Sequence, residues 1–239
     1  MTEQLWTDVD AYIERQLVGE DPALEAALQA SADAGLPPIA LSPTQGKLLH
    51  LLARMHGARS ILELGTLGGY STIWLARALP PDGRLLTLEL NERYAQVAAA
   101  NADRAGLAGL IKIDVGPALD SLHALIAEDA GPFDFVFIDA DKQSTPEYFP
   151  LVLQLTRPGS AIVTDNSVRD GELIDPDSHD PAARGMRRFH ELLAAASSPE
   201  GDRAGARRVS ATTIQTVGSK GYDGFTLALV EHPVTGRER

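Results

Sequence analysis

The sequence contains no cysteine in its 239 residues. This absence excludes disulfide bonds, thiolate zinc sites and cysteine nucleophiles, and it suits the reducing environment of the cytoplasm. Long apolar runs are also missing, and the N-terminus lacks the basic segment followed by an apolar stretch that marks a signal peptide. We therefore expect a soluble, cytoplasmic protein with no membrane partner.

Positive charge is scarce as well, since the formal net charge is −12 at pH 7. Proteins that bind nucleic acids need a basic surface that displaces counterions from phosphates. We therefore expect no nucleic-acid partner and a small molecule as the substrate. Lysine occurs only at Lys47, Lys112, Lys142 and Lys220, so a lysine beside a candidate site is notable. The six histidines show no short zinc-binding spacing.

The first 57 residues predict two or three helices. Asp21-Pro22 and Ser42-Pro43-Thr44-Gln45 have the form of helix starts, the second as a capping box, and Gly35 and Gly57 are stop signals. The first helix carries an apolar stripe that could pack onto its own domain, cover a site or form a dimer contact. The stripe consists of Leu5, Trp6, Val9, Tyr12, Ile13 and Leu17.

From Arg59 onward, predicted strands and helices alternate. We expect strands near residues 60–64, 84–89, 110–114, 133–138 and 160–164, and helices such as 92–105 and 146–155. A polar, acidic loop then runs through Asp180, followed by a helix around 186–196 and two paired strands at 209–217 and 225–230. The segment from Ser197 to Gly205 is rich in glycine, serine and charge and is the one we expect to be flexible.

This alternation predicts an α/β fold. We expect a Rossmann-like, doubly wound, mostly parallel seven-stranded sheet with an antiparallel C-terminal strand and extra N-terminal helices. The length is compatible with a single domain spanning residues 1–239. Within it, residues 1–57 would form the N-terminal helices, and residues 58–239 the cofactor-binding sheet with its helices.

Oxygen-bearing side chains follow two neighbouring strands of the predicted sheet. Asp139 ends one apolar run, and Asp165 and Asn166 end the next. An aspartate at a strand end often only caps the following helix, but the carboxyl ends of parallel strands meet at one edge, so these three oxygens should converge. Such donors suit Mg²⁺, Mn²⁺ or Ca²⁺. Lys142 would stand beside that metal.

The first strand leads into a Gly-rich turn from Gly65 to Gly69, where backbone N–H groups can meet an anionic group. A dinucleotide G-x-G-x-x-G motif opening at Gly65 would need glycine where this chain has Leu67 and Tyr70, which weakens a nicotinamide interpretation. The second strand ends at Glu89, about where a ribose would lie beside such a turn.

In this order, the motifs resemble those of class I S-adenosylmethionine-dependent methyltransferases. More narrowly, they resemble the metal-dependent catechol and caffeoyl-CoA O-methyltransferase family, over roughly Leu41 to the C-terminus. The motifs that carry the resemblance are Leu62-Glu63-Leu64-Gly65-Thr66 with Gly69-Tyr70-Ser71, Gly116-Pro117-Ala118-Leu119-Asp120, Phe137-Ile138-Asp139-Ala140-Asp141-Lys142 and Asp165-Asn166.

The resemblance implies a role for each of these residues. S-adenosylmethionine would contact Leu41, Glu63, Gly65, Thr66, Gly69, Tyr70, Ser71, Glu89, Ala118 and Asp139, with Glu89 on the ribose and Ala118 by the adenine. The implied metal ligands are Asp139, Asp165 and Asn166. Lys142 would be the catalytic base, with Asp139 and Asn166 completing the catalytic set. The family also implies a homodimer.

The resulting hypothesis is an S-adenosylmethionine- and divalent-metal-dependent O-methyltransferase. A vicinal diol or catechol could chelate the metal, and Lys142, near a dication, should lose its proton more easily than a surface lysine. Ser167 to Gly171 stand where many relatives carry an aromatic or apolar residue, so an aromatic clamp on the substrate is in doubt. Two alternatives stay open: a nucleotide-dependent dehydrogenase on the same architecture, and a catalytically silent adenosylmethionine-binding protein.

Overall fold

The computed structural model describes residues 2–198 and 207–232. The chain divides into two compact units, which comprise residues 1–121 with 217–221 and residues 122–216 with 222–239. The single domain expected from the sequence stays a prediction. The segment expected to be flexible lies almost wholly outside the described residues, since only its first two residues are described and Ser197 ends a helix.

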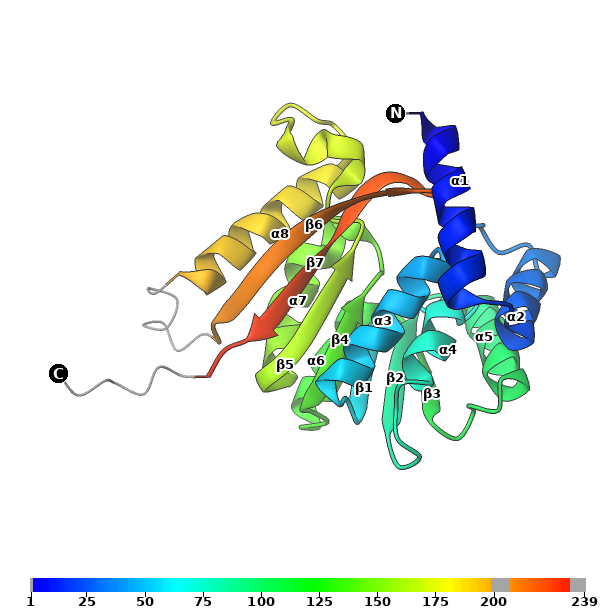
Figure 1. Cartoon of the computed structure of the whole chain (residues 1–239). Coiled ribbons are helices and arrows are strands. Elements are labelled where there is room, and N and C mark those ends of the chain that lie inside the picture. Colours follow the sequence, from blue (N-terminus) through cyan, green and yellow to red (C-terminus); the bar gives the residue numbers. More distant parts are fainter. Residues whose placement is uncertain (1, 199–206, 233–239) are drawn as a thin grey trace. The chain divides into compact units, whose positions relative to one another are not determined.

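The strands form the seven-stranded sheet that the sequence predicts (Figure 1), in the order β3-β2-β1-β4-β5-β7-β6. The pairs β1 with β2, β2 with β3 and β4 with β5 are parallel, whereas β5 and β7 are antiparallel. This confirms the mostly parallel Rossmann-like sheet with an antiparallel C-terminal strand. The strands are β1 (Ser60–Leu64), β2 (Arg84–Glu89), β3 (Ile111–Val115), β4 (Phe133–Ile138), β5 (Thr156–Asp165), β6 (Val209–Gly218) and β7 (Gly221–Val230).

In the first unit, α4 and α5 lie against β2 and β3, and α3 lies beside α4. The predicted capping box is present, because Ser42 Oγ accepts from Gln45 N and Gln45 Oε1 accepts from Ser42 N. Gly57 ends the helix with a φ of 72°. The helices that begin in this unit are α1 (Glu3–Ile13), α2 (Pro22–Asp33), α3 (Pro43–His56), α4 (Tyr70–Ala76), α5 (Glu92–Arg104) and α6 (Ala118–Ala127), with a π-helical turn, η1, at Glu14–Val18.

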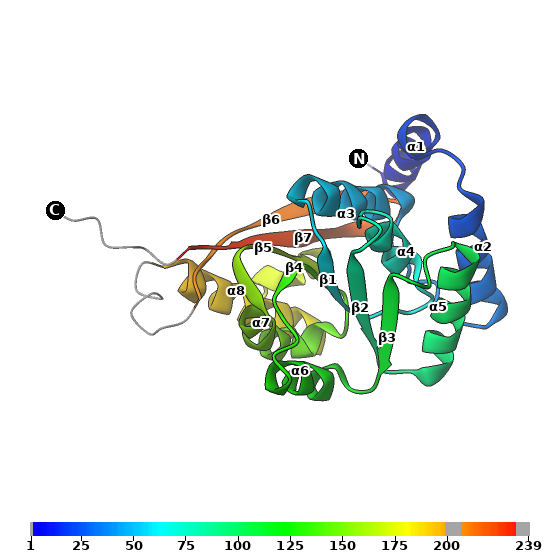
Figure 2. The same ribbon diagram turned by 90° about the horizontal axis from the view of Figure 1, so that it is seen from below.

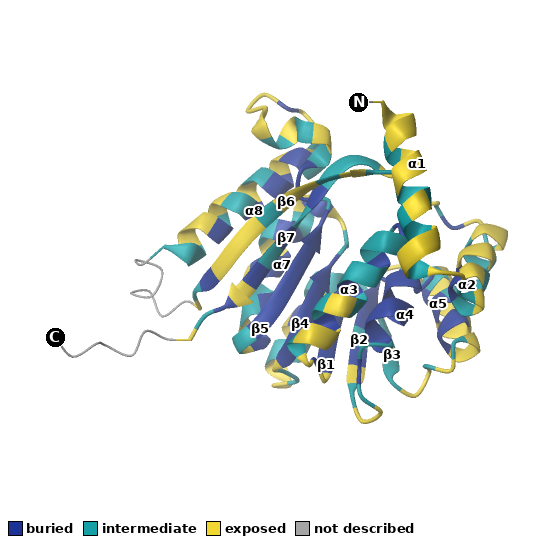
Figure 3. Ribbon diagram, viewed as in Figure 1, coloured by how far each residue is buried: buried dark blue, intermediate teal, exposed yellow. Residues whose placement is uncertain are grey.

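The first helix buries none of its residues (Figure 3). Of the predicted apolar stripe, Trp6 and Ile13 are half-buried, whereas the other members are exposed. Asp10 ties the helix to the tip of the β6–β7 hairpin, since its Oδ2 accepts from Ser219 N at 2.7 Å. Most of the stripe is therefore uncovered in the single chain.

In the second unit, α7 (Thr145–Gln154) packs on β5, and α8 (Pro181–Ser197) lies beside α7 (Figure 2). Phe149 and Phe189 join the two helices edge to face, with ring centroids 5.4 Å apart. Two short 3₁₀ segments, η2 (Lys142–Ser144) and η3 (Arg169–Ile174), follow β4 and β5. Every residue of β4 is buried, as expected for a central strand.

Three elements that lie wholly or mostly in this unit begin several residues earlier than predicted, among them β7, which starts at Gly221 rather than at Phe225. Helix α8 starts at Pro181 rather than near Met186, because Asp180 caps it by accepting from Ala182 N at 3.0 Å. Strand β5 starts at Thr156 rather than at Ser160, because an irregularity lets Thr156 still pair with Phe133. Ser160 stabilises that irregularity, since its Oγ donates to Phe133 O (2.7 Å).

No helix among the described residues is long and apolar enough to cross a membrane.

Candidate functional site

The Gly-rich turn between β1 and α4 has the left-handed backbone that favours glycine. Gly65, Leu67 and Gly69 have φ values of 92°, 51° and 81°. Gly65 N donates to Leu88 O at 2.9 Å, and Gly69 N donates to Thr66 O at 2.8 Å. These bonds close the turn before helix α4 begins. The structure thus brings together Gly65, Thr66 and Gly69, which the resemblance assigns to the cofactor.

Glu89, at the end of β2, holds this turn from the neighbouring strand. Its Oε2 accepts from Thr66 N (3.2 Å) and Leu67 N (2.8 Å), and its Oε1 accepts from Asn91 N (2.9 Å). A carboxylate offers about four acceptor positions. Glu89 therefore organises the turn and still has capacity for one further donor, such as a ribose hydroxyl.

Glu63, inside β1, is fully buried. Ser71 Oγ donates to its Oε1 at 2.6 Å and Thr72 Oγ1 donates to its Oε2 at 2.5 Å. Glu63 and Ser71, which the resemblance both assigns to the cofactor, are thus in direct contact. Thr72 was missed by sequence reasoning, although its position directly after Ser71 is a signal that could have found it.

Three further residues predicted to bind the cofactor take no part in the hydrogen bonds described above. Tyr70 is buried in an apolar cluster with Trp74, and Leu41 packs against that cluster. Ala118 is the first residue of α6 and is half-buried. Their roles toward the cofactor stay predictions.

The carboxyl edge of β4 and β5 lies in the second unit. Ile138 and Thr164 are partners in the parallel register, so the next residues, Asp139 and Asp165, follow side by side. Asn166 comes directly after Asp165 and has a φ of 51°, which is uncommon for any residue other than glycine. The structure therefore brings the three predicted metal ligands to one edge of the sheet.

Lys142 stands at the same edge. Its side chain is only 9% exposed, and its Nζ donates to Asp139 Oδ1 at 2.6 Å. Asp141 fixes the segment, because its Oδ2 accepts from Ser144 N (3.2 Å) and its Oδ1 from Tyr148 Oη (2.5 Å). Burial and the Asp141 carboxylate raise the pKa of Tyr148, so this hydroxyl stays a donor.

Negative charge accumulates at this edge. Burial, and after it the neighbouring Asp139 carboxylate, raise the pKa of Asp165 to about 7, while Lys142 acts in the opposite direction. Among the described residues, no group of three or more His, Cys, Asp or Glu side chains is arranged so that it could hold a metal ion. The predicted metal ligands differ from such a group, because they comprise two carboxylates and one amide oxygen.

Two residues beside this edge were not found from the sequence. Asp223, on β7, accepts a hydrogen bond from Asn166 Nδ2 at 3.2 Å. Gly185, within α8, lies so close to the Lys142 segment that a Cβ there would be 2.6 Å from Gln143 Cα. Gly185 precedes the helix predicted at residues 186–196, so no sequence signal marked this close approach, and nothing in the sequence links residue 223 to residue 166.

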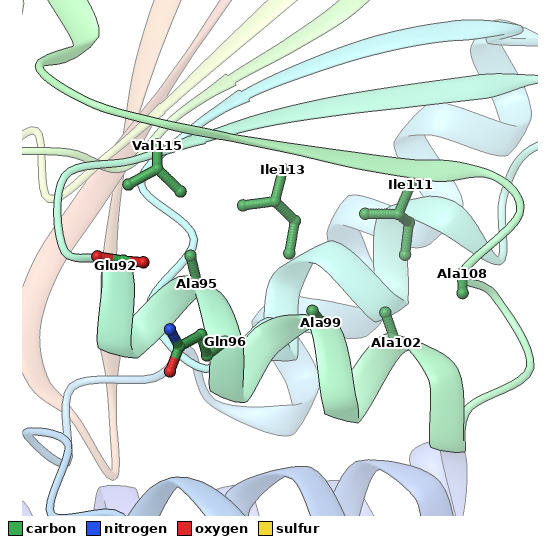
Figure 4. A pocket seen from close by; sticks show the side chains of 9 residues that line it. All are labelled: Glu92, Ala95, Gln96, Ala99, Ala102, Ala108, Ile111, Ile113 and Val115. Atoms are coloured by element: carbon green, nitrogen blue, oxygen red, sulfur yellow. The ribbon is translucent and has the colours of Figure 1, made fainter.

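A separate pocket lies in the first unit between α5 and the edge strand β3. It has a volume of about 390 Å³, and Figure 4 shows alanines of α5 facing Ile111 and Ile113 across it. Glu92 and Gln96 supply its polar side chains. None of the predicted site residues lines it.

Comparisons with known proteins identify the family. A sequence profile described as O-methyltransferase matches residues 14–200. A catechol O-methyltransferase from Niastella koreensis is 51% identical over 231 residues, which cover 97% of this chain and all of the relative.

Solved structures agree with this match. An O-methyltransferase from Bacillus cereus in complex with SAH has a TM-score of 0.90 and 53% identity, covering 96% of this chain and 100% of that one. The O-methyltransferase TomG from Streptomyces achromogenes, involved in tomaymycin synthesis and in complex with SAM, has a TM-score of 0.88 and 52% identity, covering 97% and 100%. These findings favour methyl transfer over the dehydrogenase alternative. The chain belongs to the O-methyltransferase family and is a class I S-adenosylmethionine-dependent enzyme of that family.

Proposed function

We propose that this enzyme methylates a hydroxyl of a small vicinal-dihydroxy compound, catechol-like or phenolic, and that it needs a divalent metal ion and Lys142 as general base. The observation that carries the proposal is the cluster of Asp139, Asp165, Asn166 and Lys142 at the ends of β4 and β5. The similarity to a relative named catechol O-methyltransferase supports the substrate class.

The donor set fits a hard divalent cation. Two carboxylates lie together at this edge, and the raised pKa of Asp165 reflects its burial first and the neighbouring Asp139 carboxylate second, effects that the single ammonium of Lys142 does not offset. Asn166 donates through Nδ2 to Asp223, so its amide oxygen is the atom left for a cation. We assign Asp139, Asp165 and Asn166 as ligands of Mg²⁺, with Mn²⁺ and Ca²⁺ as alternatives.

For S-adenosylmethionine, we assign Leu41, Glu63, Gly65, Thr66, Gly69, Tyr70, Ser71, Glu89, Ala118 and Asp139. The remaining acceptor position of Glu89 suits a ribose hydroxyl. The bonds of Glu63 to the first residues of α4 hold the turn rigid, which orients the methionine end of the cofactor.

The chemistry follows from the residues at the β4–β5 edge. A divalent cation held by Asp139, Asp165 and Asn166 would acidify the substrate hydroxyl. Lys142, which is nearly excluded from water, would accept the hydroxyl proton in its neutral amine form. The substrate oxygen then forms a bond to the methyl carbon as the sulfur–methyl bond breaks, which leaves S-adenosylhomocysteine and the methyl ether.

The test is methyl transfer from labelled S-adenosylmethionine to a panel of catechols and other vicinal diols, each with Mg²⁺ and with a chelator. Turnover that disappears with the chelator is expected. Turnover that survives chelation would contradict the metal requirement. Cofactor binding without turnover on any acceptor of the panel would contradict the proposed substrate class.

Lys142→Ala tests the base. We expect kcat to fall by about 10² to 10⁴, the usual contribution of a general base. Lys112→Ala is the matched control, because Lys112 is an exposed lysine of β3. Circular dichroism checks that both variants keep the fold. Full activity of the Lys142 variant would exclude this lysine as the base.

We further infer a homodimer located in the cytoplasm. Support for the dimer comes from the exposed apolar side chains of α1. The absence of cysteine suits the compartment.

A further inference from the structure

Asp223 binds the loop that follows β5 through both of its carboxylate oxygens. Its Oδ1 accepts from Val168 N and Arg169 N, each at 2.9 Å, and from Gly224 N, also at 2.9 Å. Its Oδ2 accepts from Asn166 Nδ2 at 3.2 Å. One side chain of β7 therefore holds the backbone of this loop and the side chain of a proposed metal ligand together.

The loop needs such a partner because its backbone is strained. Asn166, Arg169 and Asp170 have φ values of 51°, 55° and 54°. Asparagine and aspartate tolerate this conformation better than other residues apart from glycine, so the strain falls mainly on Arg169, and such strain collects at functional sites.

The approach of β7 to this loop is close. Ser167 N donates to Gly224 O at 2.9 Å, and a Cβ at Gly224 would lie 2.6 Å from Val168 Cγ2. A larger residue at position 224 would push the strand away. Asp223 is thus held at a fixed distance from the loop.

We propose that Asp223 is a positioning residue of the metal site, which commits the Asn166 amide nitrogen to itself and leaves the amide oxygen for the cation. The inference rests on the proposed metal-dependent function. An amide has its donor and its acceptor on opposite arms, so an acceptor fixed at the nitrogen selects one of the two orientations. Partners of this kind tune metal affinity without touching the metal.

The test separates positioning from charge. Asp223→Asn removes the charge and replaces one of the two acceptor oxygens with an NH₂ group, which cannot accept from Asn166. Asp223→Glu keeps the charge and displaces the carboxylate by one methylene. Asp141→Asn is the matched charge control, because Asp141 is an exposed carboxylate two residues from Asp139 whose side chain binds Ser144 and Tyr148. The comparison with Asp141→Asn can be made with whichever of the two Asp223 variants folds.

The readout is the dissociation constant for Mn²⁺, measured by electron paramagnetic resonance in the absence of substrate, with SAH affinity measured by calorimetry to monitor the fold. We expect both Asp223 variants to bind Mn²⁺ about 10- to 100-fold more weakly, with SAH affinity unchanged. Asp141→Asn should have a clearly smaller effect.

The outcomes distinguish the two proposals. If the wild-type protein binds no Mn²⁺, the metal-dependent function and the role of Asp223 both fail. If the wild-type protein binds Mn²⁺ and Asp223→Glu binds it equally well, only the positioning role is overturned. Equal losses in Asp223→Asn and Asp141→Asn with an intact Asp223→Glu would assign the effect to charge alone.

Discussion

Gly185 is the residue that allows helix α8 to lie directly on the backbone of the Lys142 segment. A Cβ at this position would overlap Lys142 O and lie 2.6 Å from Gln143 Cα. Both of these are backbone atoms, so neither can move aside by changing a rotamer. The backbone of the proposed base, Lys142, thus packs directly against α8, which has no side chain at the point of contact.

Gly185→Ala should therefore destabilise the protein and impair catalysis. Overpacking costs about 1–3 kcal/mol, more than the helix propensity that alanine gains. A small displacement of Lys142 should lower kcat by about 10- to 100-fold. Urea unfolding and initial rates measure the two effects.

The matched control is Gly109→Ala, since nothing lies within 4 Å of a Cβ at Gly109 and its φ is ordinary. This variant should change stability by no more than about 0.5 kcal/mol. Equal behaviour of the two variants would show that the close approach of α8 does not matter.

At the scale of elements, the start of α2 depends on a charged cap. Asp21 accepts from Ala23 N and Leu24 N, both at 3.1 Å, and pairs with Arg77 at 2.5 Å. The hydrogen bond from Arg77 is the main cause that lowers the pKa of Asp21, and burial acts against it.

Because the folded pKa lies below the unfolded one, the stability contributed by Asp21 is present above about pH 4 and is lost as the pH falls through the folded value. Asp21→Ala should cost about 1 kcal/mol at pH 7 and progressively less below pH 4. Asn91→Ala, which removes the uncharged cap of α5, is the control and should cost a similar amount at every pH. Urea unfolding from pH 7 to pH 3 measures both, and a loss for Asp21→Ala that stays constant would contradict the titration.

The pocket between α5 and β3 gives a second prediction at this scale. Ala99 and Ala100 are both exposed, but Ala99 points toward β3 in Figure 4 and lines the pocket, whereas Ala100 does not line it. Ala99→Leu should fill apolar space and raise the free energy of unfolding by about 0.5–1 kcal/mol relative to Ala100→Leu. Thermal unfolding of the two variants measures this difference. Identical stabilities would show that the pocket cannot hold the added side chain.

At the scale of the whole molecule, the notable feature is the apolar face of α1, which is exposed in the single chain. Leu5, Val9 and Tyr12 are 45%, 47% and 59% exposed and recur at helical spacing. We expect a homodimer by light scattering. The double variant Leu5→Glu/Tyr12→Glu should shift it toward monomer, because charges would be buried at the contact.

Ile174→Glu is the control for this prediction. Ile174 is 87% exposed and lies in η3 rather than in α1. The dimer should persist in this variant. A monomeric wild-type protein would remove the dimer proposal, and a dimer that survives the double variant would place the contact elsewhere.

Sequence reasoning found most of the fold because the relevant signals are local. The capping box at Ser42 and the alternation of apolar runs with helical patterns each depend on a few neighbouring residues. The start of α8 was placed too late, since a helix beginning at Pro181 depends on the Asp180 cap, which is hidden in an acidic loop. The π-helical turn after α1 has no local signal.

The sequence by itself determined which residues meet at the β4–β5 edge, because the C-terminal ends of parallel strands lie at the same edge of a sheet, whatever elements surround that sheet. Only the tertiary structure decided that Asp223 holds Asn166, because these residues are 57 positions apart and meet through the order in which β5 and β7 pair. The same holds for Gly185 and the Lys142 segment. Such contacts depend on strand order and helix packing, which are set by the balance of all contacts rather than by any short run of residues.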